Sequence, residues 1–192
     1  MSLPTEPVQW TKQSQSNSFL ISTDRSLLSI PALNAAFASD YMYWLKAYPE
    51  EILQGIIDSS FCLGLHKVQS PSKTAAEINT KSTSLEQIGF ARLVTDNYTF
   101  GYLTDVYVLP EYQGLGLGGW ILDCVDELVA PLPHLRWFIL RTAEAKSVQS
   151  YQRRLEMDIL DNGDYTKGGV FMGKKGAGLT LKLNSGGNSS DS

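Results

Sequence analysis

Residues 105–119 read DVYVLPEYQGLGLGG and join a strand-like run to a helix-like run through a loop with four glycines. The run before the loop, residues 102–109, is rich in β-branched and aromatic side chains, which favours a β-strand. Apolar side chains recur at helical spacing over residues 116–129 and predict an amphipathic helix there. This order of strand, glycine loop and helix predicts a ligand site at the start of the helix.

The glycines and the helix start together favour an anionic ligand. Glycine tolerates positive φ and lets the backbone approach a ligand closely. The free N–H groups of a first helical turn, aided by the helix dipole, suit a pyrophosphate. A tight turn without any ligand is the alternative, but such a turn needs one glycine and not four.

Two other phosphate motifs fit the loop less well. Gly114, Gly116 and Gly119 match the dinucleotide fingerprint G-x-G-x-x-G. That fingerprint normally opens a doubly wound sheet, whereas about one hundred residues precede it here and too few follow for the remaining units. The chain has no Gly-Lys-Ser/Thr after the loop, which excludes a P-loop.

Hydrophobic periodicity predicts one mixed α/β domain in the order β-α-α-β-β-β-α-β-α-β-β. Helices are expected after Ser29, after Pro49, and over residues 116–129 and 147–155. The expected strands are residues 19–21, 61–68, 88–95, 102–109, 137–140, 170–172 and 179–183. A long exposed hairpin loop is predicted over residues 69–86, which are rich in Ser, Thr and Lys.

The domain is expected to span residues 18–183. Residues 1–17 predict a flexible N-terminal tail or the lead-in to a first strand, and residues 184–192, which consist of Ser, Gly, Asn and Asp, predict a disordered C-terminal tail. Cys62 and Cys124 each lie in an apolar run, so both are predicted to be buried free thiols.

Composition excludes several classes of protein. The net charge is −4 and Lys and Arg do not cluster, so we expect no nucleic-acid partner. No apolar run reaches eighteen residues, so we expect no membrane partner. The polar N-terminus lacks a signal-peptide pattern, which predicts a cytoplasmic enzyme, with the nucleus as the alternative. The chain has two histidines and no Cys/His spacing typical of a metal site.

The glycine loop resembles the cofactor motif of the GNAT (GCN5-related N-acetyltransferase) superfamily, Arg/Gln-x-x-Gly-x-Gly/Ala, at residues 113–118 (QGLGLG). Residues 108–110 (VLP) resemble the Val-x-Pro that ends the preceding strand in that superfamily. Residues 89–96 (GFARLVTD) and 102–110 (YLTDVYVLP) are similar to a group of GNAT proteins common in bacteria. So are residues 21–24 (ISTD) and the Tyr43-Trp44 pair followed by Pro49, and the resemblance covers about residues 19–175.

The resemblance implies a GNAT fold. This is a single twisted mixed sheet of about seven strands, flanked by about four helices and splayed between its fourth and fifth strands, here residues 102–109 and 136–142. Acetyl-CoA is expected in the splay, with its pantetheine arm on the backbone of Val106, Tyr107 and Val108. Its pyrophosphate is expected on the loop residues Gln113, Gly114, Leu115, Gly116, Leu117 and Gly118. The implied reaction is transfer of the acetyl group to an amine that attacks the thioester directly.

The general acid is left open between two positions. Many GNAT proteins carry Tyr-x-x-Phe-Gly-Phe, in which the Tyr protonates the leaving thiolate. Residues 151–157 read YQRRLEM, and if LEM replaces Phe-Gly-Phe the expected Tyr position holds Gln152. Tyr151 is one residue away, so it is either the acid or a packing residue.

Asp105 is the candidate base, since a charged residue in an apolar strand requires a partner. In a regular strand it shares a face with Leu103 and Tyr107. The alternative is an Asp that caps or orients a neighbouring loop.

Tyr43 and Trp44 are the candidate acceptor-binding residues, because aromatic faces attract an ammonium group. They lie with Tyr41 and Tyr48 between the first two predicted helices, where GNAT proteins build the acceptor site. Packing in the core is the alternative for these rings.

Three functions follow from the resemblance. The first is an N-acetyltransferase that acts on a small-molecule amine, the second acts on a peptide or protein amine, and the third binds acyl-CoA without turnover.

Overall fold

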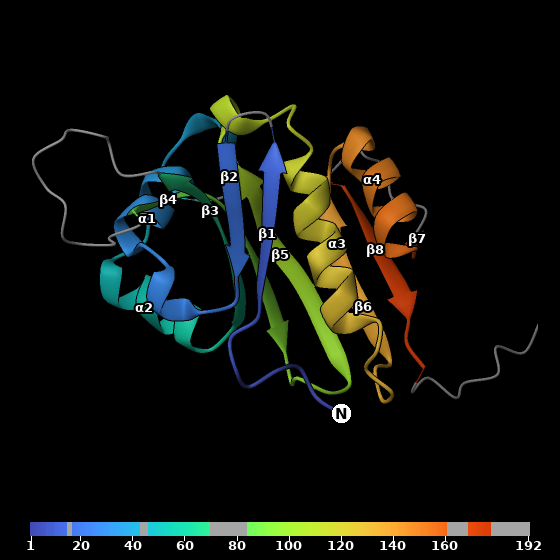
Figure 1. The fold of residues 1–192 in the computed structure, drawn as a ribbon. Coiled ribbons are helices and arrows are strands. Elements are labelled where there is room, and N and C mark those ends of the chain that lie inside the picture. Colours follow the sequence, from blue (N-terminus) through green and yellow to red (C-terminus); the bar gives the residue numbers. More distant parts are fainter. Residues whose placement is uncertain (15–16, 43–45, 70–83, 161–168, 178–192) are drawn as a thin grey trace, which may run out of the picture.

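The computed structural model describes residues 1–14, 17–42, 46–69, 84–160 and 169–177. Within these ranges the protein is an α/β domain with one eight-stranded sheet in the order β1-β2-β3-β4-β5-β6-β8-β7 (Figure 1). The strands are β1 (Gln9–Ser14), β2 (Asn17–Ser22), β3 (Phe61–Gln69), β4 (Ser84–Thr95), β5 (Phe100–Val108), β6 (Trp137–Thr142), β7 (Asp158–Ile159) and β8 (Val170–Lys175). The helices are α1 (Ile30–Phe37), α2 (Glu50–Asp58), α3 (Leu117–Val129) and α4 (Ala145–Leu155). This confirms the predicted fold class.

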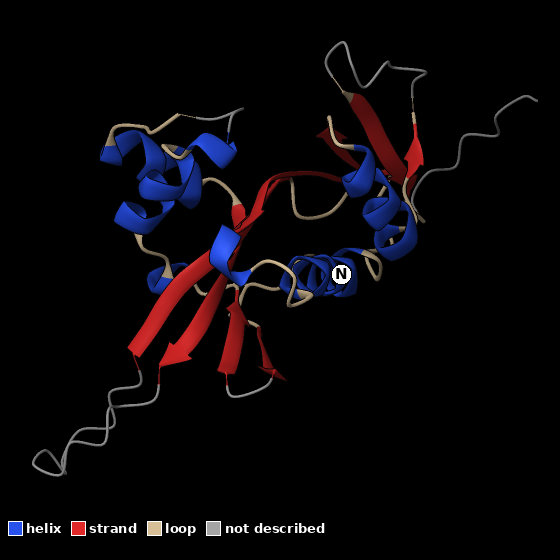
Figure 2. Ribbon diagram, turned by 90° about the horizontal axis from the view of Figure 1, so that it is seen from above, coloured by secondary structure: helices blue, strands red, loops and turns tan. Residues whose placement is uncertain are grey.

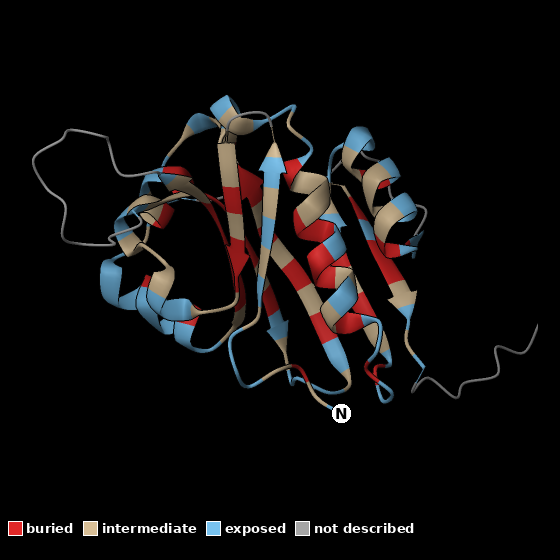
Figure 3. Ribbon diagram, in the orientation of Figure 1, coloured by how far each residue is buried: buried red, intermediate tan, exposed pale blue. Residues whose placement is uncertain are grey.

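The helices cover both faces of the sheet. Seen from above, α1 and α2 lie on one side of the strands and α3 lies on the other (Figure 2). The buried apolar residues accordingly form two clusters (Figure 3). The smaller cluster, under α1 and α2, contains Phe37, Phe90 and Tyr107. The larger one packs β-strand residues such as Leu103 and Phe138 against α3 and α4.

The first two helices begin where their sequences predict. The Ser29 hydroxyl accepts a hydrogen bond from the N–H of Ala32, which caps α1, and a proline lies in the first turn. Helix α2 follows Pro49 and carries Glu50 and Glu51 in its first turn, where the helix dipole favours negative charge.

The prediction of a flexible tail over residues 1–17 is wrong for residues 9–14, which form β1 and pair with β2. Its backbone pairs with the adjacent strand β2 from Gln9↔Ser22 to Ser14↔Asn17, and two of its side chains also contact a helix far along the chain. The Trp10 indole donates to Glu127 over 3.0 Å, and the Lys12 ammonium lies 5.5 Å from the ring centroid of Trp120. Both partners belong to α3. The sequence of this strand, QWTKQS, has no alternating apolar pattern, so the local pattern of residues does not reveal it.

Some predicted elements lie outside the described residues: the strand 179–183, the tail 184–192, and most of the loop 69–86. The strands β1 and β7 were not predicted, and together with the six predicted strands that the structure describes they make up the eight-stranded sheet.

Cys62 and Cys124 are free and buried, as predicted. Burial raises the pKa of each thiol to about 12, so neither forms a reactive thiolate near neutral pH.

The sheet is split between its only two parallel neighbours among the described strands, β5 and β6. They pair from Phe100↔Trp137 to Leu103↔Leu140, and the pairing then stops. Both strands continue, β5 as far as Val108 and β6 as far as Thr142. The predicted splay between these two strands is therefore confirmed.

Helix α4 ends at Glu156 in the left-handed conformation, with φ of 49°. Leu155 and Met157 on either side are buried, which holds this turn in place. Glycine usually occupies such a position, because a side chain there is strained.

We predict that Glu156→Gly stabilises the protein by about 1 kcal/mol, because glycine relieves the left-handed strain. For a chain of this size the melting temperature should rise by about 2–4 °C. Glu156→Ala is the matched control, since it also removes the exposed ion pair with Lys174 but keeps a Cβ. Thermal unfolding of both variants tests this, and an equal response of the two would contradict it.

Candidate active site

A cleft of about 920 Å³ opens where β5 and β6 separate. One wall is the end of β5 and the loop that follows it. The other wall is the end of β6 and the first half of α4. The η2 turn (Asp40–Met42) contributes Tyr41 and Met42.

The glycine loop has the backbone that its sequence predicts. Gly114 has φ of 80° and Gly116 has φ of 72°, both in the left-handed region. A Cβ on either residue would meet no atom within 4 Å, so the space in front of the loop is open. The Gln113 side-chain amide donates to the carbonyl of Val108 over 2.9 Å and ties the loop to the end of β5.

Helix α3 presents unpaired amides to the cleft. Gly116 is its N-cap and supplies no side chain to cap it. The hydrogen bond of helical type closest to its start runs from the N–H of Trp120 to the carbonyl of Gly116 over 3.1 Å. The N–H groups of Leu117, Gly118 and Gly119 therefore have no partner within the helix. With the helix dipole they form a binding site for an anion.

Tyr151 lines the cleft from α4, between the glycine loop and the end of β6. Burial raises the pKa of its phenol to about 12, and the negative charge of Glu144 adds to this shift. The phenol therefore stays protonated near neutral pH and can donate a proton. Its neighbour Gln152 is exposed and does not line the cleft, so Tyr151 is the one of the two that reaches it.

Asp105 sits at a bulge in β5 that the sequence did not reveal. Arg92 of β4 is opposite Thr104, and Phe90 is opposite Tyr107, so β5 carries one extra residue between these pairs. Asp105 is this extra residue, and its backbone has a φ of 54°. A regular strand would place Asp105 on one face with Leu103 and Tyr107. The bulge makes this prediction wrong for Leu103, whereas Tyr107 packs in the smaller cluster under α1 and α2. Leu103 packs in the larger cluster with α3, whereas Asp105 turns to the opposite face.

The Asp105 carboxylate is engaged through both oxygens. Its Oδ2 lies 2.6 Å from Nε of Arg92, and its Oδ1 accepts from the Thr104 hydroxyl over 3.1 Å. The side chain is only 7% exposed. This environment favours the second interpretation of Asp105, a residue that orients the backbone, and its role as a base stays a prediction.

The other predicted cofactor residues fall into two groups. Leu115 does not line the cleft, and its side chain packs against the larger core cluster. The remaining ones do line it: Val106, Tyr107, Val108, Gln113, Gly114, Gly116, Leu117 and Gly118. Tyr43 and Trp44 lie outside the described residues.

Seven polar residues of the cleft were not singled out from the sequence: Tyr102, Thr104, Arg141, Glu144, Thr142, Ser147 and Ser150. The last three lie at the carboxyl end of β6 and at the start of α4. Since ligands of open sheets bind at the carboxyl ends of parallel strands, the buried run 137–140 followed by a helix was a usable signal.

The end of the cleft near η2 has an aromatic wall. The rings of Tyr41 and Tyr107 lie 6.4 Å apart, and the ring of Phe37 lies 6.3 Å from that of Tyr107. Burial raises the pKa of both tyrosines, so both stay neutral hydroxyls near neutral pH. A ligand at this end therefore meets flat rings and hydroxyl groups.

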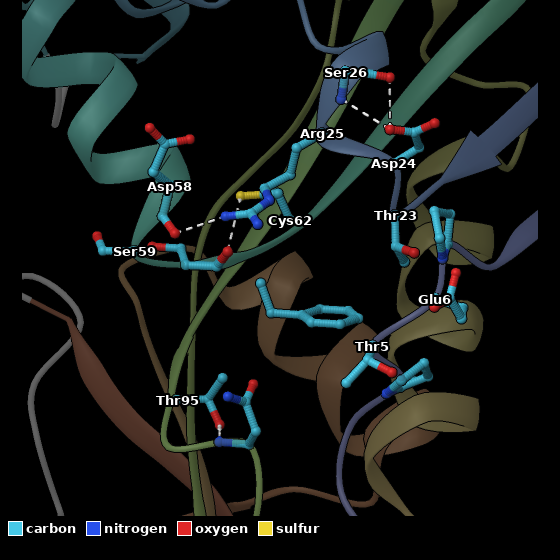
Figure 4. Close-up of a pocket in the computed structure, with 15 residues that line it drawn as sticks. Thr5, Glu6, Thr23, Asp24, Arg25, Ser26, Asp58, Ser59, Cys62 and Thr95 are labelled. Atoms are coloured by element: carbon cyan, nitrogen blue, oxygen red, sulfur yellow. Dashed lines mark hydrogen bonds between the residues drawn. The ribbon is translucent and has the colours of Figure 1, made fainter.

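A second pocket, of about 620 Å³, shares no lining residue with the cleft. It lies between the N-terminal segment, the η1 turn (Arg25–Leu27) and the residues that follow α2 (Figure 4). Arg25 crosses one wall and donates to the carbonyl of Asp58 over 2.6 Å. The predicted catalytic and cofactor residues all lie outside it.

Within the described ranges no group of three or more His, Cys, Asp or Glu side chains could hold a metal ion. None of the described helices is long and apolar enough to cross a membrane.

The sequence matches a known family. Residues 76–154 match the family model described as Acetyltransferase (GNAT) domain. The curated protein "Putative acetyltransferase FG08082" of Gibberella zeae is 37% identical over 179 residues, which cover 92% of this chain and 93% of that protein. The chain belongs to the GNAT acetyltransferase family.

Solved structures share the fold. A GNAT-family protein from Xanthomonas campestris is 29% identical, with a TM-score of 0.53 over 78% of this chain and 97% of its own. Spermidine N-acetyltransferase from Vibrio cholerae, solved with CoA and spermine, has a TM-score of 0.57 at 12% identity and covers 90% and 96%. Arabidopsis thaliana NAA60, solved with acetyl-CoA, has a TM-score of 0.54 at 12% identity. The match covers 88% of this chain and 98% of that protein. The last two show a common fold and no more.

Proposed function

We propose that the cleft between β5 and β6 binds acetyl-CoA and that the protein transfers the acetyl group to the amine of a small molecule. One observation carries this proposal. The unpaired amides of α3, the open edge of β5 and the protonated phenol of Tyr151 all border the same cleft.

The cleft fits the two parts of the cofactor that need hydrogen bonds. Among the described strands, the edge of β5 that faces β6 has no ladder partner beyond Leu103, so backbone groups of Val106 and Tyr107 are available to pantetheine amides. The Val108 carbonyl already accepts a hydrogen bond from Gln113. The pyrophosphate then meets the amides of Leu117 and Gly118 at the start of α3.

Amine acetylation requires stabilisation of the thioester carbonyl oxygen, attack by the amine with loss of the thiolate, and two proton transfers. A backbone N–H near Val108 stabilises the charge that develops on the carbonyl oxygen. The amine nitrogen bonds to the carbonyl carbon, the carbon–sulfur bond breaks, and Tyr151 protonates the departing thiolate. The amine proton goes to water, because Arg92 and Thr104 already engage the Asp105 carboxylate.

The aromatic wall supports a small-molecule acceptor. Tyr41 and Tyr107 close the η2 end of the cleft with rings, and rings attract an ammonium group or a flat ligand. A peptide acceptor needs several polar groups that pair with its backbone, and the described part of this wall offers the hydroxyl groups of Tyr41 and Tyr107.

Gly116 tests the position of the pyrophosphate. We expect Gly116→Asp to weaken acetyl-CoA binding by at least about tenfold, because its carboxylate repels the phosphates. Gly116→Asn is the matched control, since Asn has the same shape and also tolerates the left-handed backbone. Calorimetry on both variants measures the difference, and equal affinities for the two would place the pyrophosphate elsewhere.

Tyr151 tests the proton transfer. We expect Tyr151→Phe to lower kcat by about a hundredfold and to leave the affinity for acetyl-CoA nearly unchanged, since only a hydroxyl is removed. Gln152→Ala, on the exposed neighbour, is the control. Unaltered turnover in Tyr151→Phe would rule out this acid.

The raised pKa of Tyr151 also predicts a pH profile. The acid must be protonated, so its contribution is lost only as the pH rises through about 12. Wild-type turnover should therefore show no loss with a midpoint near 10, the usual value for a tyrosine. A midpoint near 10 that disappears in Tyr151→Phe would contradict the raised pKa.

The reaction itself is tested by thiol release from acetyl-CoA with a panel of small amines, a panel of peptides, and no acceptor. We expect release with small amines only. Release with peptides alone would favour a protein acceptor. Absence of release, together with a rise in melting temperature on addition of acetyl-CoA, would indicate a binding module without turnover.

A further inference from the structure

We propose that Arg92 is a positioning residue for acetyl-CoA, which acts through Asp105 to hold the β5 bulge that keeps β5 and β6 apart. The inference rests on the proposed function, because it assigns a cause to the cleft where the cofactor would bind.

The bulge carries a backbone conformation that needs support. Asp105 has φ of 54°, which costs free energy for any residue with a Cβ and persists only where the surroundings hold it. Asp tolerates this region better than most residues, since its short side chain can form local hydrogen bonds. Here the hydroxyl of the preceding Thr104 donates to its carboxylate.

Arg92 supplies the support from outside the strand. Its Nε lies 2.6 Å from Oδ2 of Asp105, and its Nη1 donates to the Ser60 hydroxyl over 3.2 Å. One guanidinium thus joins β4, the bulge of β5 and the segment that follows α2. The Asp105 side chain is 7% exposed, so returning it to the other face would leave two charges unpaired in a largely buried site.

The position of the bulge coincides with the end of the pairing between β5 and β6. The last pair is Leu103↔Leu140, and the extra residue of β5 follows at once. Because β6 continues for two residues, an undistorted β5 would place Thr104 opposite Arg141 and Asp105 opposite Thr142. Those pairs would close the floor of the cleft, and Thr104, Asp105, Arg141 and Thr142 all line it.

The experiment separates the backbone shape from the charges. Arg92→Met with Asp105→Gly removes both charges and keeps a residue that adopts positive φ without strain. Arg92→Met with Asp105→Val removes the same charges and installs a β-branched residue that disfavours this conformation. Both should fold, because replacing both partners of a buried ion pair is often tolerated.

We expect the Gly variant to bind acetyl-CoA within about threefold of wild type and the Val variant to bind at least about tenfold more weakly. Calorimetry gives the affinities, and KM for acetyl-CoA should rise while KM for the acceptor amine changes little. If the Val variant does not fold, Asp105→Ala with Arg92→Met replaces it, with the same direction expected and circular dichroism as the check of folding.

Two outcomes overturn the inference while the proposed function stands: equal binding by the Gly and Val variants, or a Val variant that binds as tightly as wild type. Equal loss in both would show that the charges themselves, and not the bulge, determine affinity. Failure of the wild-type protein to bind acetyl-CoA would instead overturn the proposed function, and this inference with it.

Discussion

Four residue pairs of the parallel ladder between β5 and β6 join the two halves of the sheet, and the site depends on where that pairing stops. Up to Leu103 the strands are parallel neighbours in one continuous sheet. Past this point β5 leads into the glycine loop and β6 leads into α4. The two elements that carry the anion site and the phenol therefore diverge from a common base, and their spacing is set by the rigid sheet below them. The cleft therefore follows from the arrangement of the sheet itself.

The cleft offers neutral hydrogen-bond donors, and two exposed charged residues, Arg141 and Glu144, line it as well. The first turn of α3 offers amides, the open edge of β5 offers backbone groups, and Tyr151 offers a phenol kept protonated by burial. Such groups are held by the fold, so they cost no reorganisation when charge develops on a ligand. The Asp105 carboxylate borders the cleft but is committed to Arg92 on the α2 side of the sheet. Its charge thus shapes the backbone of β5.

The end of α4 shows how a helix terminus selects the residue that reaches the cleft. Glu156 closes the helix in the left-handed conformation between two buried side chains, Leu155 and Met157. This arrangement is the one expected if Leu155, Glu156 and Met157 occupy the positions that Phe-Gly-Phe has in the family motif. Counting back from them leads to Gln152, yet the helix phase turns Gln152 to solvent and Tyr151 to the cleft. The spacing of the motif predicted that a residue near 151–152 would line the cleft. The packing of α4 on α3 determined that this residue is Tyr151.

The sequence by itself determined the features that depend on local chemistry: the helices, the central strands, the glycine loop with its positive φ values at Gly114 and Gly116, and the buried thiols. Only the tertiary structure decided β1, the bulge at Asp105 and the entry of Tyr151 into the cleft. The physical reason is the same in each case. β1 is held by its pairing with β2 together with side-chain contacts to α3, Asp105 by Arg92 on a neighbouring strand, and Tyr151 by the way α4 packs. A partner that lies far along the chain leaves no trace in the local pattern of residues.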